Sequence, residues 1–237
     1  MRVRPLPLKT TSMQIKKTIF YVDGFNLHHG LLKGTHDQWL DLEQFAIALL
    51  PRPTEHEIVA VKYFTARIRY NPADPQAAFN QDRYLEALGS LAKVKIIEGF
   101  YKRFRVKLPF AKEPCKSCEK VPYGIVYRTV EKRSDVNLAT EMMADVLRKS
   151  ADTFVVVSGD VDFAAPLCFI RHEIGLRTLV FNPHDNVCEE LRRFTSYYKN
   201  IPRDLPGKCQ LPDEVTLANG RVVHRPAAWT LCGPGGS

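Results

Sequence analysis

The chain has 237 residues, of which 45% are hydrophobic and 25% charged, so its composition is that of a globular protein with room for one sizeable domain. Its apolar runs are far shorter than the roughly 20 residues that a membrane-spanning helix requires, so we expect no membrane span. The net charge of +8 favours anionic partners such as nucleic acids.

In chain order, five apolar runs have the length and β-branched content of buried strands, and helical spacing of apolar residues separates most of them. Residues 1–13 and 203–237 lack sustained periodicity, so we expect one domain over 14–202 between an N-terminal and a C-terminal extension. The predicted strands are 17–22, 57–66, 93–100, 153–157 and 177–181. The helical stripes are Leu42, Phe45, Ala46 and Leu49, then Phe79, Tyr84, Leu85 and Leu88, then Val136, Ala139, Met143 and Val146, the last preceded by Ser134 as a candidate N-cap.

The alternation of strands and helices predicts an α/β fold with a mainly parallel sheet covered on both faces. One segment, 101–130, interrupts the alternation because it is basic, contains three prolines and has strand-like flanks. We expect this segment to form a hairpin-like insertion. In open parallel sheets the active crevice lies beyond the carboxyl ends of the strands, so functional residues are expected there.

Acidic residues stand where two of the predicted strands end. Asp23 closes the first strand, and Asp160 and Asp162 follow the fourth. Asp135 occupies the first turn of the helix after the insertion. Hard carboxylate oxygens suit Mg²⁺ or Mn²⁺, and clustered carboxylates repel one another unless a cation neutralises them. A metal held there can activate water and stabilise charge on phosphoryl oxygens, so the sequence predicts hydrolysis of a phosphodiester.

The alternative is that each acid only caps a turn or a helix. Asp is common in turns, and acidic residues stabilise helix N-termini. Capping explains each residue separately, but it gives no reason for acids to gather at the carboxyl ends of two apolar strands. We therefore favour the metal site.

The insertion carries most of the positive charge of the chain. Between residues 101 and 133, ten Lys or Arg stand against three acids, a balance of +7. Aromatic residues are interleaved with these cations, a mixture that binds single strands by phosphate attraction and base stacking. Arg103, Arg105 and Lys107 are the candidate phosphate contacts. The alternative is a hairpin whose aromatic side chains pack on the core and whose charges are merely solvated.

Six cysteines are spread too thinly for a disulfide framework, and no apolar segment follows the basic N-terminus, so a reducing, cytoplasmic location is expected. Cys115 and Cys118 have the spacing of one zinc knuckle, although a structural zinc site needs two further ligands. Candidate donors are His184, Cys188, Cys209 or the same knuckle of a second copy in a homodimer. A pair of free thiols is the favoured alternative.

Three ordered motifs resemble those of the NYN domain family, which is PIN-like. They are Val22–Asn26, Glu131–Ala139 and Val157–Phe163, and the resemblance covers about residues 16–198. It implies a three-layer α/β/α sandwich with an acidic, Mg²⁺- or Mn²⁺-dependent site that cleaves RNA. By motif position the acids would be Asp23, Asp135, Asp160 and Asp162, with Asn26 orienting metal-bound water or phosphate.

The chain departs from the family pattern beside Asp135. Arg133 and Ser134 stand where the family has Gly and Val, and Arg133 and Lys132 are candidate phosphate contacts. The family's later acid on this helix corresponds to Glu141, which at 3.6 residues per turn lies about 120° from Asp135, at the margin of the site.

We therefore expect a metal-dependent ribonuclease that acts on RNA, preferably single-stranded. Two alternatives stay open: a non-catalytic RNA-binding module in which the acids only cap, and a metal-dependent phosphohydrolase of small nucleotides.

Overall fold

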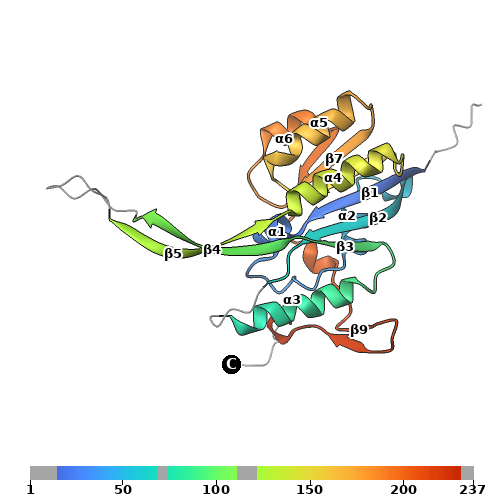
Figure 1. Ribbon diagram of the computed structural model, residues 1–237. Coiled ribbons are helices and arrows are strands. Elements are labelled where there is room, and N and C mark those ends of the chain that lie inside the picture. The colour runs from blue at the N-terminus through green and yellow to red at the C-terminus, as the bar shows by residue number, and fades with distance from the viewer. Residues whose placement is uncertain (1–14, 69–73, 111–121, 231–237) are drawn as a thin grey trace, which may run out of the picture.

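A six-stranded sheet forms the centre of the molecule in the computed structural model, which describes residues 15–68, 74–110 and 122–230 (Figure 1). The strand order is β3-β2-β1-β6-β7-β8, and all neighbouring strands run parallel. The strands are β1 (Lys16–Asp23), β2 (His56–Thr65), β3 (Val94–Glu98), β6 (Thr153–Val157), β7 (Arg177–Asn182) and β8 (Tyr197–Asn200). The mainly parallel sheet and all five predicted strands are confirmed.

Helices cover both faces of this sheet. In β1, Phe20 and Val22 pack into one hydrophobic cluster, whereas Ile19 and Tyr21 pack into the other, which explains why the strand is apolar without alternation. One face carries α1 (Gly24–Leu27), a π-helical turn (His28–Leu32), α2 (Leu42–Leu49) and α3 (Pro75–Leu88). The other carries α4 (Ser134–Leu147), α5 (Ala164–His172) and α6 (Glu189–Phe194). The fold is therefore the expected PIN-like α/β/α sandwich (Figure 1). No helix in the described ranges has the length and apolar character needed to cross a bilayer.

The predicted helical stripes agree to different degrees with the residues that the structure buries. All four residues of the α2 stripe are buried, whereas Phe79 in α3 is 50% exposed. The stripe on α4 was partly wrong, because Val136 is 68% exposed and the buried row is Leu138, Met142 and Val146. Both rows fit a period of 3.6 residues, and only packing against the sheet selects between them.

The start of α4 also differs from the prediction. Its N-cap is Arg133, in the left-handed region with φ 79°, and Ser134 is the first helical residue. The Ser134 hydroxyl donates a hydrogen bond to the Glu131 carboxylate instead of capping the helix.

The insertion is a two-stranded antiparallel hairpin that projects from the body of the protein (Figure 1). It consists of β4 (Phe100–Pro109) and β5 (Tyr123–Lys132). Tyr123 and Tyr127 are 58% and 64% exposed, so these two rings do not pack on the core.

Residues 203–230 fold back onto the α2 and α3 face and include a small hairpin, β9 (Glu214–Thr216) and β10 (Val222–His224). Trp39 Nε1 donates a hydrogen bond to the Pro212 carbonyl oxygen at 2.8 Å, and the Trp39 and Trp229 rings lie 6.2 Å apart. Isolated buried residues such as Leu211 anchor this segment, which is why it shows no periodicity in the sequence.

Candidate active site

The acids lie at the topological switch point of the sheet. The chain winds outward from β1 through β2 to β3, and in the other direction from β6 through β7 to β8. The crevice of a parallel sheet opens beyond the carboxyl ends of the two strands at which the order reverses. Asp23 is the last residue of β1, and Asp160 follows β6, its neighbour, so both stand at this point.

Asp23 is a buried carboxylate held on both oxygens. Its Oδ1 accepts the backbone N–H of Asn26 at 2.9 Å, which caps α1, and its Oδ2 accepts the hydroxyl of Ser158 at 3.0 Å. Burial raises its pKa to about 7 although both hydrogen bonds act in the opposite direction. Gly24 allows the close turn, because a Cβ there would lie 2.7 Å from the carbonyl oxygen of Phe64.

Three other acids gather at the surface beside it. Asp135, in the first turn of α4, offers a carboxylate oxygen within 4.8 Å of oxygens from Asp160 and Asp162. Burial and the charges of Asp160 and Asp162 raise the pKa of Asp135. Mutual repulsion of this kind is what a bound cation relieves, and carboxylate oxygens are the ligands that hard divalent cations prefer. The three side chains therefore have the chemistry to hold a hard divalent cation.

Asp23 does not belong to that surface group. Its carboxylate lies deeper, although the charge of Asp135 is near enough to contribute to its raised pKa. The structure thus divides the four acids into a surface triad (Asp135, Asp160 and Asp162) and one buried carboxylate. Capping also occurs at Asp160, whose Oδ1 accepts the backbone N–H of Asp162 at 3.0 Å, so capping and a place in the triad are compatible.

Ser158, which the sequence analysis did not single out, joins the two acidic loops. Its hydroxyl donates to Asp23 and accepts the backbone N–H of Asp160 at 3.1 Å. Asn26 makes a second link, since its Oδ1 accepts the backbone N–H of Gly159 at 2.8 Å and lies 3.1 Å from His184 Nε2. The signal that could have identified Ser158 was its place directly after a buried strand and before the Gly-Asp turn.

Glu141 is engaged elsewhere. Its carboxylate lies 2.6 Å from Lys62 Nζ, which also forms a 2.5 Å ion pair with the buried Asp145. Tyr21 donates its hydroxyl to the same Asp145 oxygen at 2.7 Å. Glu141 thus belongs to an ion-pair network within the α4 layer and not to the surface triad.

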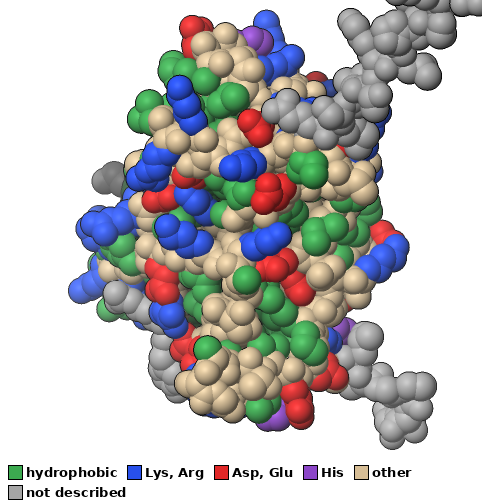
Figure 2. Space-filling model, turned by 90° about the vertical axis from the view of Figure 1, so that its right-hand side faces the viewer, with side chains coloured by type: hydrophobic (Ala, Val, Ile, Leu, Met, Phe, Trp, Pro, Cys, Tyr) green, Lys and Arg blue, Asp and Glu red, His purple; other side chains and the backbone are tan. Residues whose placement is uncertain are grey.

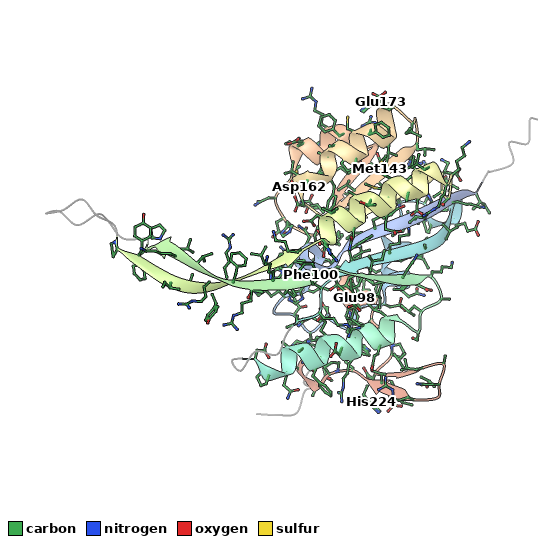
Figure 3. All side chains as sticks on the ribbon, viewed as in Figure 1. Glu98, Phe100, Met143, Asp162, Glu173 and His224 are labelled. Carbon is green, nitrogen blue, oxygen red and sulfur yellow. The ribbon has the colours of Figure 1, made fainter. Side chains whose placement is uncertain are left out.

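The predicted phosphate contacts are separated by the hairpin register. Arg103, Arg105 and Lys107 alternate along β4 and share one face. Lys132 pairs with Phe100 and therefore lies on the opposite face. The guanidinium of Arg133 sits 5.0 Å from the centre of the Phe100 ring. Phe100 marks the root of the hairpin, and Asp162 and Glu173 stand at opposite ends of α5, with Asp162 drawn on the side of the hairpin root (Figure 3).

The face of the molecule opposite the hairpin has mixed charge. Basic and acidic side chains are intermingled there with small apolar areas (Figure 2). In the sequence, by contrast, ten Lys or Arg stand against three acids between residues 101 and 133, the segment that contains the hairpin.

Cys115 and Cys118 lie outside the described residues. Within the described ranges, the surface triad is the only group of three or more His, Cys, Asp or Glu that could hold a metal. The candidate donors His184, Cys188 and Cys209 do not form such a group there.

A cavity of about 550 Å³ adjoins the acids, with Gly24 and Glu131 in its wall. The charge of Glu131 raises the pKa of Asp23, and the charge of Asp135 raises the pKa of Glu131, so this wall residue lies close to both acids. The cavity is lined by segments far apart in the chain, so no local sequence pattern predicts it.

Comparison with known proteins gives a family, a curated protein of similar sequence and a similar solved structure. The chain is 28% identical, over 90% of its own length and 75% of the relative's, to 6-hydroxy-3-succinoylpyridine 3-monooxygenase HspA of Pseudomonas putida. It is similar to the crystal structure of VPA0982, a protein of unknown function from Vibrio parahaemolyticus, with a TM-score of 0.48 and 15% identity over 85% of this chain and 100% of that one. The sequence model of the NYN domain matches residues 18–201. The chain therefore belongs to the NYN domain family, a nuclease-like family with a PIN-like fold.

Proposed function

We propose that this protein is a metal-dependent ribonuclease that hydrolyses phosphodiester bonds in RNA, with Mg²⁺ or Mn²⁺ held by Asp135, Asp160 and Asp162. The observation that carries the proposal is the convergence of these three carboxylates within 4.8 Å at the switch point of the sheet. Membership of a nuclease-like family supports it.

The residues of the candidate active site have distinct roles in this proposal. The surface triad would hold the cation, which when bound supplies activation of water and stabilisation of charge on the phosphoryl oxygens. Asp23 is the fourth acid, and Ser158 and Asn26 fix the direction of its carboxylate. The side-chain Oδ1 of Asn26 already accepts the backbone N–H of Gly159 and lies beside His184 Nε2. The side-chain N–H groups of Asn26 are therefore the part that would orient water or phosphate.

The hairpin would bind the RNA strand. Arg103, Arg105 and Lys107 share one face and would follow the phosphates, while Lys132 and Arg133 would contact phosphate near the root of the hairpin. The exposed rings of Tyr123 and Tyr127 favour single strands, whose bases are free to stack.

The test is cleavage of a single-stranded RNA by the purified full-length chain. We expect cleavage with Mg²⁺ or Mn²⁺, loss of cleavage with EDTA, and a loss of at least about 100-fold in Asp160→Asn. Glu173→Gln, which removes an exposed acid at the far end of α5, is the matched control and should cleave normally. Unchanged cleavage in Asp160→Asn would remove the assignment of the site. RNA binding without any chelator-sensitive cleavage would favour the non-catalytic module.

A second candidate function has one observation in its favour, the cavity beside the acids. Its volume of about 550 Å³ suits a small ligand, and the name of the relative HspA describes a monooxygenase of a substituted pyridine. Consumption of a hydroxypyridine with O₂ and reduced nicotinamide, without cleavage of RNA, would favour this candidate.

A further inference from the structure

The cavity beside the acids is built from segments that are far apart in the sequence. It opens between α1, the carboxyl end of β2, α3, the root of the hairpin and the C-terminal residues around Trp229. Its volume of about 550 Å³ lies within the range of small-ligand sites, roughly 300–1,000 Å³. Its wall includes Gly24, which follows Asp23 in the chain, and Glu131, whose charge raises the pKa of Asp23, so the cavity lies beside Asp23.

Seven of the residues that line the cavity carry a ring. The Phe25 side chain is 45% exposed, and its ring centre lies 4.1 Å from that of His29. Phe25 and His29 are both exposed and both line the cavity, so their rings are accessible to a ligand there. The seven rings come from Phe25, His28, His29, Tyr63, Tyr84, Tyr101 and Trp229.

Polar groups interrupt the aromatic wall at intervals. Gln76 and Asn80 on α3 contribute amide groups, and Gln38 and Thr65 contribute a further amide and a hydroxyl. Flat rings on the walls and a few hydrogen-bonding groups at the edges suit a planar nitrogen heterocycle, which stacks on its faces and forms hydrogen bonds at its rim.

The basic face of the hairpin leads into this cavity. Residues paired across an antiparallel ladder share a face, so the Tyr101–Glu131 pair lies on the same face as Arg103, Arg105 and Lys107. Tyr101 and Glu131 also line the cavity. The Arg103 guanidinium lies 4.3 Å from the centre of the Tyr127 ring, so cation and aromatic ring form one surface along this face.

We propose that the cavity binds one unpaired base of an RNA strand whose phosphates follow this face of the hairpin, so that the bond cut next to the base lies over the acids. RNA as the ligand rests on the proposed function. The cavity would accept any planar nitrogen heterocycle. The experiment must therefore distinguish a base of an RNA strand from a free heteroaromatic compound.

The experiment measures the binding of a short, labelled single-stranded RNA to the full-length chain by fluorescence anisotropy, with EDTA present so that no strand is cut. A single abasic nucleotide is moved along the RNA. We expect one abasic position to weaken binding by about 5- to 150-fold, the range that corresponds to stacking of one base on an aromatic ring. Phe25→Ala should weaken binding of the intact RNA by a similar factor and abolish the dependence on the abasic position.

Two further variants keep the test decisive. Phe79→Ala removes a phenylalanine of similar exposure that lies on α3 but outside the cavity wall, and it should leave the dependence intact. Tyr101→Leu removes a second ring of the wall and should repeat the effect of Phe25→Ala. Binding that is indifferent to every abasic position, or equal in Phe25→Ala and Phe79→Ala, would overturn the proposal.

Isothermal titration with adenosine, uridine and a hydroxypyridine separates the two sources of the ring. Tight binding of a free compound that Phe25→Ala abolishes, together with indifference to abasic positions, would assign the cavity to a small molecule and overturn the strand model. Absence of metal-dependent RNA cleavage would remove the proposed function but leave position-dependent binding as an independent result.

Discussion

The Asn26 side-chain oxygen accepts the backbone N–H of Gly159 at 2.8 Å and so ties the loop after β1 to the loop after β6. Asn26→Ala leaves the N–H of Gly159 without its acceptor, which should cost about 1–3 kcal/mol in the free energy of unfolding. RNA cleavage should fall by at least about 10-fold, because the hydrogen bond that holds the loops of Asp23 and Asp160 together is lost. Urea unfolding and kcat/KM measure the two effects. Asn219→Ala, which removes an exposed turn contact to Arg221, is the control, and wild-type values for Asn26→Ala would contradict this role of the hydrogen bond.

A divalent cation should stabilise the folded protein, because the surface triad exists only in the folded state. At a concentration 100 times its Kd, the cation should raise the free energy of unfolding by about 2.7 kcal/mol. Thermal unfolding with EDTA and with Mn²⁺ or Mg²⁺ measures the shift. It should shrink in Asp135→Asn and persist in Glu173→Gln. Equal shifts in both variants would place the cation elsewhere.

The cation-free protein should lose stability as pH rises from about 4 to about 7. The folded-state pKa of Asp23 is raised from 3.8 to about 7, so over this window the unfolded chain releases a proton that the folded protein retains. The free energy of unfolding should fall by at most about 1.4 kcal/mol per pH unit, the value for one proton. Asp23→Asn should flatten this profile and be more stable than wild type at pH 8, while losing RNA cleavage. Urea unfolding in EDTA between pH 4 and 8 tests this, and parallel profiles for the two proteins would contradict it.

Lys62 is buried between Glu141 and Asp145, at 2.6 and 2.5 Å. Lys62→Met leaves the buried Asp145 carboxylate without its cation, which should cost about 3–5 kcal/mol. RNA cleavage per folded molecule should be unchanged, since Glu141 lies outside the surface triad. Chemical denaturation and activity at a temperature where the variant is folded separate the two effects. The exposed Lys199→Met is the control, and a specific loss of cleavage in Lys62→Met would return Glu141 to the site.

The two faces of the hairpin should contribute unequally to RNA binding. Replacing Arg103, Arg105 and Lys107 together by Gln should weaken binding and reduce the slope of log affinity against log salt by about 2, or roughly 0.7 per lost phosphate contact. Replacing Lys102 and Arg128, which lie on the opposite face, should have a smaller effect for each charge removed. Anisotropy titrations at several salt concentrations measure both. Equal losses for each charge would mean that the overall charge of the hairpin, and not one face, attracts RNA.

The residue pattern alone was sufficient for the central strands and for the acids at their ends. A run such as Phe154–Val157 is apolar on both faces, and only a strand covered by two layers can bury it. The position of Asp23 and Asp160 at one edge follows, because parallel neighbouring strands end together. The basic hairpin was predictable for a similar reason, since its charge is a property of one continuous segment.

Only the tertiary structure decided what depends on how separate elements pack. The buried row of α4, with Leu138 inside and Val136 outside, is one of two rows that fit the same helical period, and the sheet selects it. Glu141 forms an ion pair with Lys62, a residue of β2 that lies far from it in the sequence, and does not join the surface triad. The aromatic cavity unites Phe25, Tyr101 and Trp229 from three segments. Each of these features is a contact between residues far apart in the chain, so no local pattern specifies it, whereas strands, charge and strand-end acids are local.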